Sequence, residues 1–352
     1  MKVAEGSTAR PDAGTERTPL LRLEGVKKYF PISRGIIFQK HIGDVHAVDG
    51  IDLEIHKGET FGLVGETGCG KSTLARVVMG LHKPTEGRIF FEGRDITKLR
   101  SGEMQELRRD MQMIFQDPFA SLNPRKTVGN IVGDSFRIHG TVPKERVKPE
   151  VQQLMELVGL NPEHYNRYPF AFSGGQRQRI GIARALALNP KLVICDEPVS
   201  ALDVSIQAQV LNLLKELQAE FNLTYLFIAH NLAVVAHISD RIGVMYLGKM
   251  VEIADSKAIT DDPRHPYTQA LISAIPVPDP TRSRNRIILE GDVPSPARPP
   301  TGCRFHPRCP IAQPNCVTDE PALELKATRH WVACHYAKSD PLDLQHAVVD
   351  AG

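Results

Sequence analysis

The sequence predicts an α/β fold built on a mostly parallel sheet, and three observations support this prediction. Apolar runs of strand length alternate with helical stretches between residues 20 and 260, a pattern typical of parallel sheets covered by helices. One apolar run, 61–64, leads into a glycine-rich loop, 65–72. Another, 192–195, ends at the acidic pair Asp196-Glu197, where α/β folds place their active groups.

The N-terminal part predicts a second, antiparallel sheet. Residues 1–19 are rich in Ser, Thr, Ala, Gly and charged residues and lack an apolar segment, so we expect a disordered tail and no signal peptide. The runs 21–30 and 47–55 predict two strands that flank an insert, 31–44, containing a proline and a glycine. Turns and short strands are expected over 84–100.

The glycine-rich loop has the residue types that phosphate binding requires. It reads Gly65-Glu66-Thr67-Gly68-Cys69-Gly70-Lys71-Ser72, and a helix over 72–81, which includes Thr73, is expected to follow. The glycines let backbone N–H groups converge on phosphate oxygens, and the helix points its positive end at the same anions. Lys71 would reach the β- and γ-phosphates, and the Ser72 hydroxyl would bind Mg²⁺.

The acidic pair at the end of the 192–195 run predicts the hydrolytic groups. A carboxylate at Asp196 can hold Mg²⁺ directly or through water, and Glu197 can orient the water that attacks the γ-phosphoryl group. An acidic loop after a core strand is the alternative. The complete phosphate loop in the same chain favours the catalytic interpretation.

Ser173-Gly174-Gly175-Gln176 predicts a second phosphate grip. Ser173 and Gln176 have the spacing of a capping box, so an ordinary helix start is one interpretation. The paired glycines are costly at a helix start unless a group must approach the backbone closely. Because the first loop already holds phosphates, we expect this site to bind the γ-phosphate of nucleotide held by another subunit, in an ATPase that works as a pair.

The chain resembles the ATP-binding subunits of ABC transporters, which have a P-loop NTPase (RecA-like) core. Besides the motifs above, Phe115-Gln116-Asp117-Pro118 resembles the Q-loop of that family, Ser200-Ala201-Leu202-Asp203 its D-loop, and His230 its switch histidine. The resemblance implies that Gln116 senses Mg²⁺ or water and relays to a membrane partner, that Asp203 acts across the dimer, and that His230 touches the γ-phosphate. Phe30, or alternatively Tyr29, would stack on adenine. The family's signature motif corresponds to Ser173-Gly174-Gly175-Gln176 with the residue before it, and that residue is Phe172 here, where the family usually has leucine.

An inserted helical subdomain is expected at about 117–172, where helical runs such as 150–158 alternate with prolines at 118, 124, 143 and 162. The core is expected to resume with helices over 180–188 and 205–221 and a strand over 224–229. Residues 222–239 contain no Asp, Glu, Lys or Arg over 18 positions. We expect a buried strand and an apolar helix there, not a membrane span.

Residues 261–352 predict a small C-terminal domain, because prolines repeatedly interrupt the sequence beyond 260. His265-Pro266-Tyr267 and the segment 302–310 resemble the C-terminal extension of dipeptide and oligopeptide importer ATPases. This resemblance implies uptake of peptides, nickel or related solutes, and the 31–44 insert and the 289–296 segment resemble the second ATPase of that subfamily. It also implies a companion ATPase, identical or related, two integral-membrane permeases and an extracytoplasmic solute-binding protein, with this chain peripheral on the cytoplasmic face of the membrane.

Four of the six cysteines lie in this C-terminal domain, at Cys303, Cys309, Cys316 and Cys334. A reducing cytosol disfavours a disulfide framework, whereas clustered thiolates can hold zinc or an iron–sulfur cluster. Their spacing does not decide between the two metals. The resemblance implies a [4Fe–4S] cluster held by all four cysteines. A zinc site that includes His306, His330 or His335, and unligated thiols, are the alternatives.

The charge balance favours a protein partner over nucleic acid. Lys and Arg total 43 against 41 Asp and Glu, a formal net charge of +2, which provides no general attraction to a polyanion. An ABC ATPase acting on nucleic acid or ribosomes remains the alternative function. A redox or metal sensor with a vestigial ATPase is a third hypothesis, although every catalytic position is filled.

Overall fold

The computed structural model describes residues 18–34, 40–275 and 286–340. The tail expected at 1–19 lies outside these residues except for its last two positions. So do residues 35–39 of the expected insert and residues 276–285 and 341–352 of the expected C-terminal domain.

The main sheet has eight strands in the order β11-β12-β10-β9-β3-β8-β7-β6. Five neighbouring strands are parallel and form its core: β3 (Thr60–Val64), β6 (Met111–Ile114), β7 (Leu192–Asp196), β8 (Thr224–Ile228) and β9 (Arg241–Tyr246). Three antiparallel strands continue the sheet: β10 (Lys249–Asp255), β11 (Glu324–Ala327) and β12 (His330–Val332). The predicted α/β fold with a mostly parallel sheet is confirmed.

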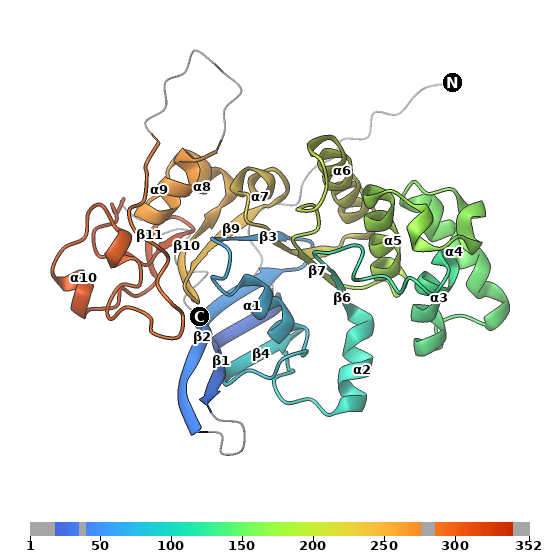
Figure 1. Cartoon of the computed structure of the whole chain (residues 1–352), viewed down its shortest axis with the longest axis horizontal. Coiled ribbons are helices and arrows are strands. Elements are labelled where there is room, and N and C mark those ends of the chain that lie inside the picture. The colour runs from blue at the N-terminus through green and yellow to red at the C-terminus, as the bar shows by residue number, and fades with distance from the viewer. Residues whose placement is uncertain (1–17, 35–39, 276–285, 341–352) are drawn as a thin grey trace, which may run out of the picture.

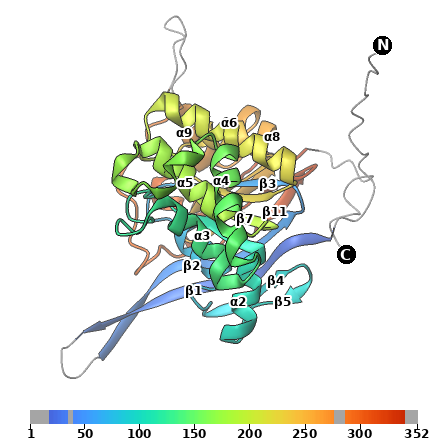
Figure 2. The same ribbon diagram turned by 90° about the vertical axis from the view of Figure 1, so that its right-hand side faces the viewer.

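A second sheet has the order β2-β1-β4-β5 and is antiparallel throughout, as expected. Its strands are β1 (Pro19–Arg34), β2 (Lys40–His56), β4 (Glu86–Phe91) and β5 (Arg94–Asp95). The prediction that an insert at 31–44 separates the two strands is wrong. Pro31 pairs with Asp44, and the two strands continue as a long hairpin (Figure 2). Proline fits there because β4 pairs with β1 only as far as Lys27, which leaves that part of β1 at a sheet edge.

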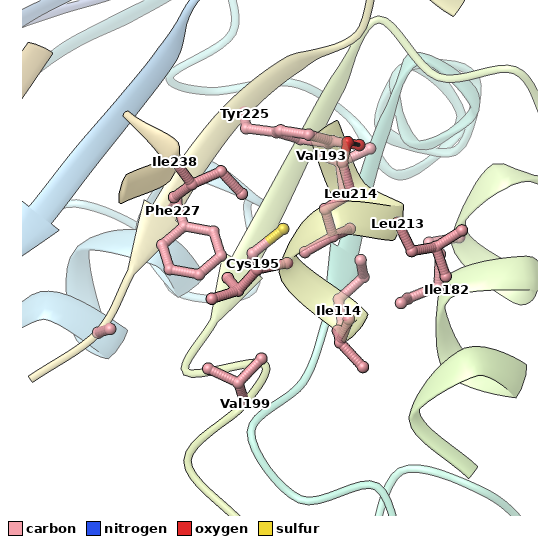
Figure 3. Packing of buried hydrophobic residues seen from close by; sticks show 14 of the residues in the cluster. Ile114, Ile182, Val193, Cys195, Val199, Leu213, Leu214, Tyr225, Phe227 and Ile238 are labelled. Atoms are coloured by element: carbon pink, nitrogen blue, oxygen red, sulfur yellow. Dashed lines mark hydrogen bonds between the residues drawn. The ribbon is translucent and has the colours of Figure 1, made fainter. Parts of the chain in front are cut away.

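The parallel strands are buried on both faces, and their side chains alternate between two cores. Val193, Cys195, Tyr225 and Phe227 face one core, which also contains Leu213 and Leu214 of α6 (Figure 3). Leu192, Ile194, Leu226 and Ile228 face the other, which contains α1 and the apolar side of the antiparallel sheet. The helices on these faces include α1 (Lys71–Val78), α6 (Val204–Phe221), α7 (Leu232–Ile238) and α8 (Ser256–Asp261).

A helical region lies at one end of the molecule (Figure 1). It consists of α3 (Val128–His139), α4 (Val147–Leu157), α5 (Gly174–Leu186) and the short turns η1 (Lys144–Arg146), η2 (Pro162–Asn166) and η3 (Pro169–Ala171). Helix α5 begins at Gly174, six residues before the helix expected at 180–188. Helix α2 (Ser101–Asp110) was not predicted, because its mostly polar sequence has no wide apolar stripe.

The C-terminal region lies at the other end, where β12 pairs with β10 and so extends the main sheet (Figure 1). It also contains α9 (Pro266–Ser273), α10 (Asn315–Thr318) and η4 (His306–Arg308). The Glu252 carboxylate on β10 is fully buried. It accepts hydrogen bonds from the backbone N–H groups of Arg264 at 2.7 Å and His265 at 3.1 Å, and lies 2.7 Å from His330 Nε2. One buried carboxylate thus joins three segments of this region.

His265 predicts a stability loss in mild acid. Its buried ring caps α9, with Nδ1 accepting the Tyr267 N–H at 3.1 Å, and burial lowers the pKa of His265 to about 4 despite the opposing effect of Glu252. Below its ordinary pKa of about 6.5, the unfolded state binds a proton that the folded state excludes. The free energy of unfolding should therefore fall by about 3 kcal/mol between pH 6.5 and 4, as measured by urea titration.

The matched variant is His265→Asn, which keeps a capping acceptor and removes the titrating group. Between pH 6.5 and 4, the slope of its unfolding free energy against pH should be smaller than that of wild type by the contribution of about one proton bound on unfolding. Equal slopes for the two proteins would contradict the assignment.

Candidate active site

The phosphate loop joins β3 to α1, and its backbone requires glycine at its end. Gly70 has φ 109°, and a Cβ atom there would lie 1.9 Å from the Ala47 carbonyl oxygen, so no other residue fits. Lys71 is 4% exposed, and its Nζ donates to the carbonyl oxygens of Gly65 at 2.7 Å and Glu66 at 3.0 Å. The loop's own carbonyl groups therefore hold the Lys71 ammonium at the place where phosphate would bind.

The other loop positions divide between exposed and buried. Thr67 and Gly68 are exposed, and a Cβ at Gly68 would meet no atom within 4 Å, so this side of the loop is open to a ligand. Cys69 is buried in the core, and burial raises the pKa of its thiol. Its thiol is therefore a packing group.

Two of the residues predicted to interact with Mg²⁺, Ser72 and Asp196, are in direct contact. Ser72 Oγ donates to Asp196 Oδ1 at 2.7 Å, which joins the start of α1 to the end of β7. Asp196 is 3% exposed; burial raises the pKa of this carboxyl, while the Ser72 hydrogen bond and Arg76 oppose that rise. The hard oxygen donors of this pair suit Mg²⁺.

Glu197 is the centre of the predicted hydrolytic site. Gln116 Nε2 donates to its Oε2 at 2.9 Å, and His230 Nδ1 lies 3.3 Å from the same oxygen. The structure thus brings together the three residues predicted to be catalytic, from the ends of β6, β7 and β8. Glu197 also has φ 48°, a left-handed conformation that costs free energy for a residue with a side chain and is concentrated at functional sites.

The second predicted phosphate grip forms a helix cap in the isolated chain. Ser173 Oγ accepts the Gln176 N–H at 3.3 Å, and Gln176 Oε1 accepts the Ser173 N–H at 3.0 Å. Asp203 likewise caps α6 and accepts the Ile206 N–H at 3.0 Å. Among the described residues, no hydrogen bond connects Ser173 or Asp203 with the phosphate loop or with Glu197.

The paired glycines of this grip have a reason within the chain that the sequence did not indicate. A Cβ at Gly175 would lie 2.5 Å from Ile206 Cγ2 on α6, whereas one at Gly174 would meet only Leu202, at 3.6 Å. Close packing of α5 on α6 therefore requires Gly175.

The two candidate aromatic residues for adenine differ in their surroundings. Tyr29 stacks on His46, with ring centroids 4.1 Å apart, and its hydroxyl donates to Asp49. Phe30 contacts His82 edge-on at 5.5 Å and has Lys28 Nζ 4.9 Å from its ring centre. One face of Tyr29 is thus already covered.

The four C-terminal cysteines surround one small cavity, together with Phe305, His306, His335 and other residues. All six cysteines of the chain, each within the described residues, are free thiols. Burial, together with the neighbouring cysteines, raises the pKa of Cys303 to about 11. In the described ranges, no group of three or more His, Cys, Asp or Glu side chains has an arrangement that could hold a metal ion.

Comparisons with known proteins agree with this geometry. The ABC transporter family matches residues 48–200, and the C-terminal region of oligopeptide/dipeptide transporters matches residues 251–316. The oligopeptide transport ATP-binding protein AppF of Bacillus subtilis is 57% identical over 90% of this chain and 97% of its own length. The chain belongs to the ABC transporter ATP-binding proteins of the oligopeptide type.

Two further similarities support this membership. The oligopeptide transport ATP-binding protein OppF of Salmonella typhimurium is 53% identical over 93% of this ABC protein and 98% of its own length. The dimeric, post-hydrolysis structure of the ATP-binding cassette MJ0796 bound to ADP and Pi has a TM-score of 0.59 and 28% identity, and covers 67% of this chain and 98% of that chain. The similarity to this solved structure confirms the P-loop NTPase core.

No helix within the described parts of this ABC protein is long and apolar enough to cross a membrane. The uncharged stretch at 222–239 forms β8 and α7, as expected.

Four residues near the nucleotide site were missed by the sequence analysis. Arg308 and Tyr267 contact Glu66 of the phosphate loop, and Arg304 pairs with Asp49 beside Tyr29. The motifs around residues 265–271 and 302–310 indicated the C-terminal extension only. Contacts across more than 200 positions of sequence leave no local pattern that predicts them.

Gly175→Ala should lower the free energy of unfolding by about 1–3 kcal/mol, because its Cβ overlaps the stiff, β-branched side chain of Ile206. Thermal or urea unfolding measures the effect. Gly174→Ala is the matched control and should change stability far less. Adding Ile206→Ala to Gly175→Ala relieves the overlap, so the double variant should lose less unfolding free energy than the sum of the losses in the two single variants. Strict additivity would contradict this packing argument.

Proposed function

We propose that this chain is the ATP-hydrolysing subunit of an ABC importer that takes up di- or oligopeptides. The observation that supports this most strongly is the convergence on Glu197 of Gln116 and His230, beside the Ser72–Asp196 pair. These groups lie at the carboxyl ends of neighbouring parallel strands, next to the phosphate loop. That arrangement suits in-line attack of water on a γ-phosphoryl group.

Each side chain then has a definite task in the reaction. Lys71 would leave the loop carbonyls for the β- and γ-phosphates of ATP, and the oxygen atoms of Ser72, Asp196 and Gln116 would hold Mg²⁺. The metal, when bound, neutralises charge on the phosphates. Glu197 orients the attacking water, and His230 moves from Glu197 to the γ-phosphate. Phe30 supports adenine, since His46 already covers one face of Tyr29.

The site is completed by a second ATPase subunit. Ser173, Gly174 and Gly175 of the companion present a helix N-terminus to the γ-phosphate, which stabilises negative charge there. Asp203 of the companion contacts the same interface. Support comes from the exposure of Ser173 and Asp203 and from the dimeric ATP-binding cassette to which this chain is similar. The companion is either a second copy or a related ATPase.

Closing and reopening of this ATPase pair drives two integral-membrane permeases. Peptide is the substrate that the C-terminal match and the oligopeptide transport relatives favour. The chain would bind peripherally to the permeases on the cytoplasmic face of the membrane, and an extracytoplasmic binding protein would deliver the peptide. These relatives lend no support to the alternative of an ATPase acting on nucleic acid or ribosomes.

The cysteine cavity is proposed to hold a [4Fe–4S] cluster. Four free thiols from separate segments line one enclosed space, a donor set that fits four-cysteine cluster ligation. A single zinc ion requires four ligands within about 2.3 Å of one point, and a zinc site that includes His306 or His335, which line the same cavity, is the alternative. The resemblance of the C-terminal extension to that of peptide importer ATPases favours the cluster. The cluster would have a structural or regulatory part, because the cavity lies outside the hydrolytic site.

Glu197→Gln should reduce kcat for ATP hydrolysis by about 100-fold or more, because an amide cannot accept a proton from the attacking water. Binding of Mg-ATP should persist and should trap the closed pair, detected by light scattering of the full chain with ATP, alone and with its companion subunit. Glu220→Gln on the surface of α6 is the control and should behave like wild type. Undiminished turnover in Glu197→Gln would refute the proposed function.

The full chain purified without oxygen should contain about four iron and four sulfide per molecule. Cys303→Ser and Cys309→Ser should lose most of this iron, whereas Cys195→Ala, which changes a buried thiol of the β7 core, should keep it. Elemental analysis and visible absorbance are the measurements. One zinc per chain would instead establish the zinc alternative, and four titratable thiols without metal would refute both.

A further inference from the structure

Among the described residues, every hydrogen bond from the C-terminal extension to the phosphate loop involves Glu66. Arg308 donates two parallel hydrogen bonds to its carboxylate, from Nη1 to Oε2 at 2.8 Å and from Nη2 to Oε1 at 3.1 Å. The Glu66 N–H donates to the Tyr267 hydroxyl at 2.8 Å. Residue 66 is therefore held through its side chain and through its backbone by residues 242 and 201 positions later in the sequence.

The two residues that hold Glu66 are themselves fixed by packing. Tyr267 is fully buried, and its ring contacts Tyr246 at 4.8 Å and Phe305 at 5.4 Å between centroids. Arg308 ends the short helical turn η4, its side chain is 9% exposed, and Nη1 also lies 3.4 Å from the Tyr246 hydroxyl. A planar guanidinium that binds both carboxylate oxygens fixes orientation as well as position.

The charge of Glu66 explains why such a contact matters to nucleotide binding. Glu66 is the only acidic residue in the loop 65–72, and a carboxylate beside a triphosphate opposes binding, most strongly where solvent is partly excluded. The Arg308 guanidinium offsets that charge. Glu66 also provides one of the two carbonyl oxygens that hold Lys71 Nζ, at 3.0 Å, so its backbone position affects the main phosphate-binding cation.

We propose that Arg308 is a positioning residue of the ATP site: it neutralises Glu66 and, with Tyr267, fixes the start of the phosphate loop. The C-terminal extension thereby sets the affinity for ATP without touching the nucleotide. This inference rests on the proposed function insofar as the loop binds ATP.

The test compares charge variants of the full chain by steady-state ATP hydrolysis and by calorimetric titration with Mg-ATP. Arg308→Gln should raise KM and Kd about tenfold with kcat within about twofold of wild type, because an unneutralised carboxylate remains beside the phosphates. The KM and Kd of Arg308→Lys should lie between those of wild type and Arg308→Gln, since lysine keeps the positive charge and loses the bidentate hydrogen bonding. The double variant Arg308→Gln/Glu66→Gln should recover most of the affinity, because the repelling charge is also gone.

The matched control is Arg329→Gln, which removes an arginine of the same extension that pairs with Asp255 at 3.1 Å and is 54% exposed; KM should not change. If the double variant binds ATP no better than Arg308→Gln, or if Arg308→Gln lowers only the melting temperature, the proposal is overturned. If Arg308→Gln does not fold, ATP binding is compared instead between Arg308→Lys and the double variant Arg308→Lys/Glu66→Gln, and the double variant should again bind ATP more tightly. Wild-type chain that fails to bind Mg-ATP would refute the proposed function as well, whereas equal binding by wild type and Arg308→Gln would refute this inference alone.

Discussion

The register of the parallel strands is the constraint on which the site depends. Ile114 of β6 pairs with Cys195 of β7, Asp196 of β7 pairs with Ile228 of β8, and Leu63 of β3 pairs with the same Ile228. Because the strands end at nearly the same level, the residues just beyond them emerge at one edge. Gln116, Glu197 and His230 meet there although they are far apart in the sequence. A shift of one residue in any strand would turn its side chains to the other face and separate these groups.

The C-terminal extension is structurally continuous with the ATPase core, because β12 continues the main sheet and Phe305 packs in the same hydrophobic core. Charge pairs connect the extension with both sides of the nucleotide site. Arg304 pairs with Asp49 beside Tyr29, and Arg308 pairs with Glu66 in the phosphate loop. The Arg304–Asp49 pair is almost fully buried, and removing one partner of such a pair leaves an uncompensated charge, which costs more free energy than the pair itself provides. The segment 303–309, which also contains two of the clustered cysteines, is therefore tied to the ATPase core.

Two of the predicted nucleotide-contacting residues, Ser173 and Asp203, also stabilise the isolated chain. Ser173 satisfies the start of α5 and Asp203 the start of α6, as ordinary caps do. Gly175 is required by the close approach of α5 to Ile206. These contacts fix the start of α5 within the isolated chain, and a group that is already positioned before binding reduces the ordering cost when a second subunit is engaged.

The sequence by itself determined the α/β class, the phosphate loop, the acidic pair and the approximate bounds of β3, β7 and β8. Each of these depends on local residue order: glycines at fixed spacing, apolar runs of strand length and the charges that follow them. Tertiary structure alone decided the contacts of Glu66 with Arg308 and Tyr267, the continuation of the main sheet by β12 and the packing need at Gly175. It also placed Pro31 in an edge strand, where the sequence predicted an insert. The physical reason is that these features depend on which segments become neighbours in space, and contacts between distant residues leave no periodic pattern in the chain.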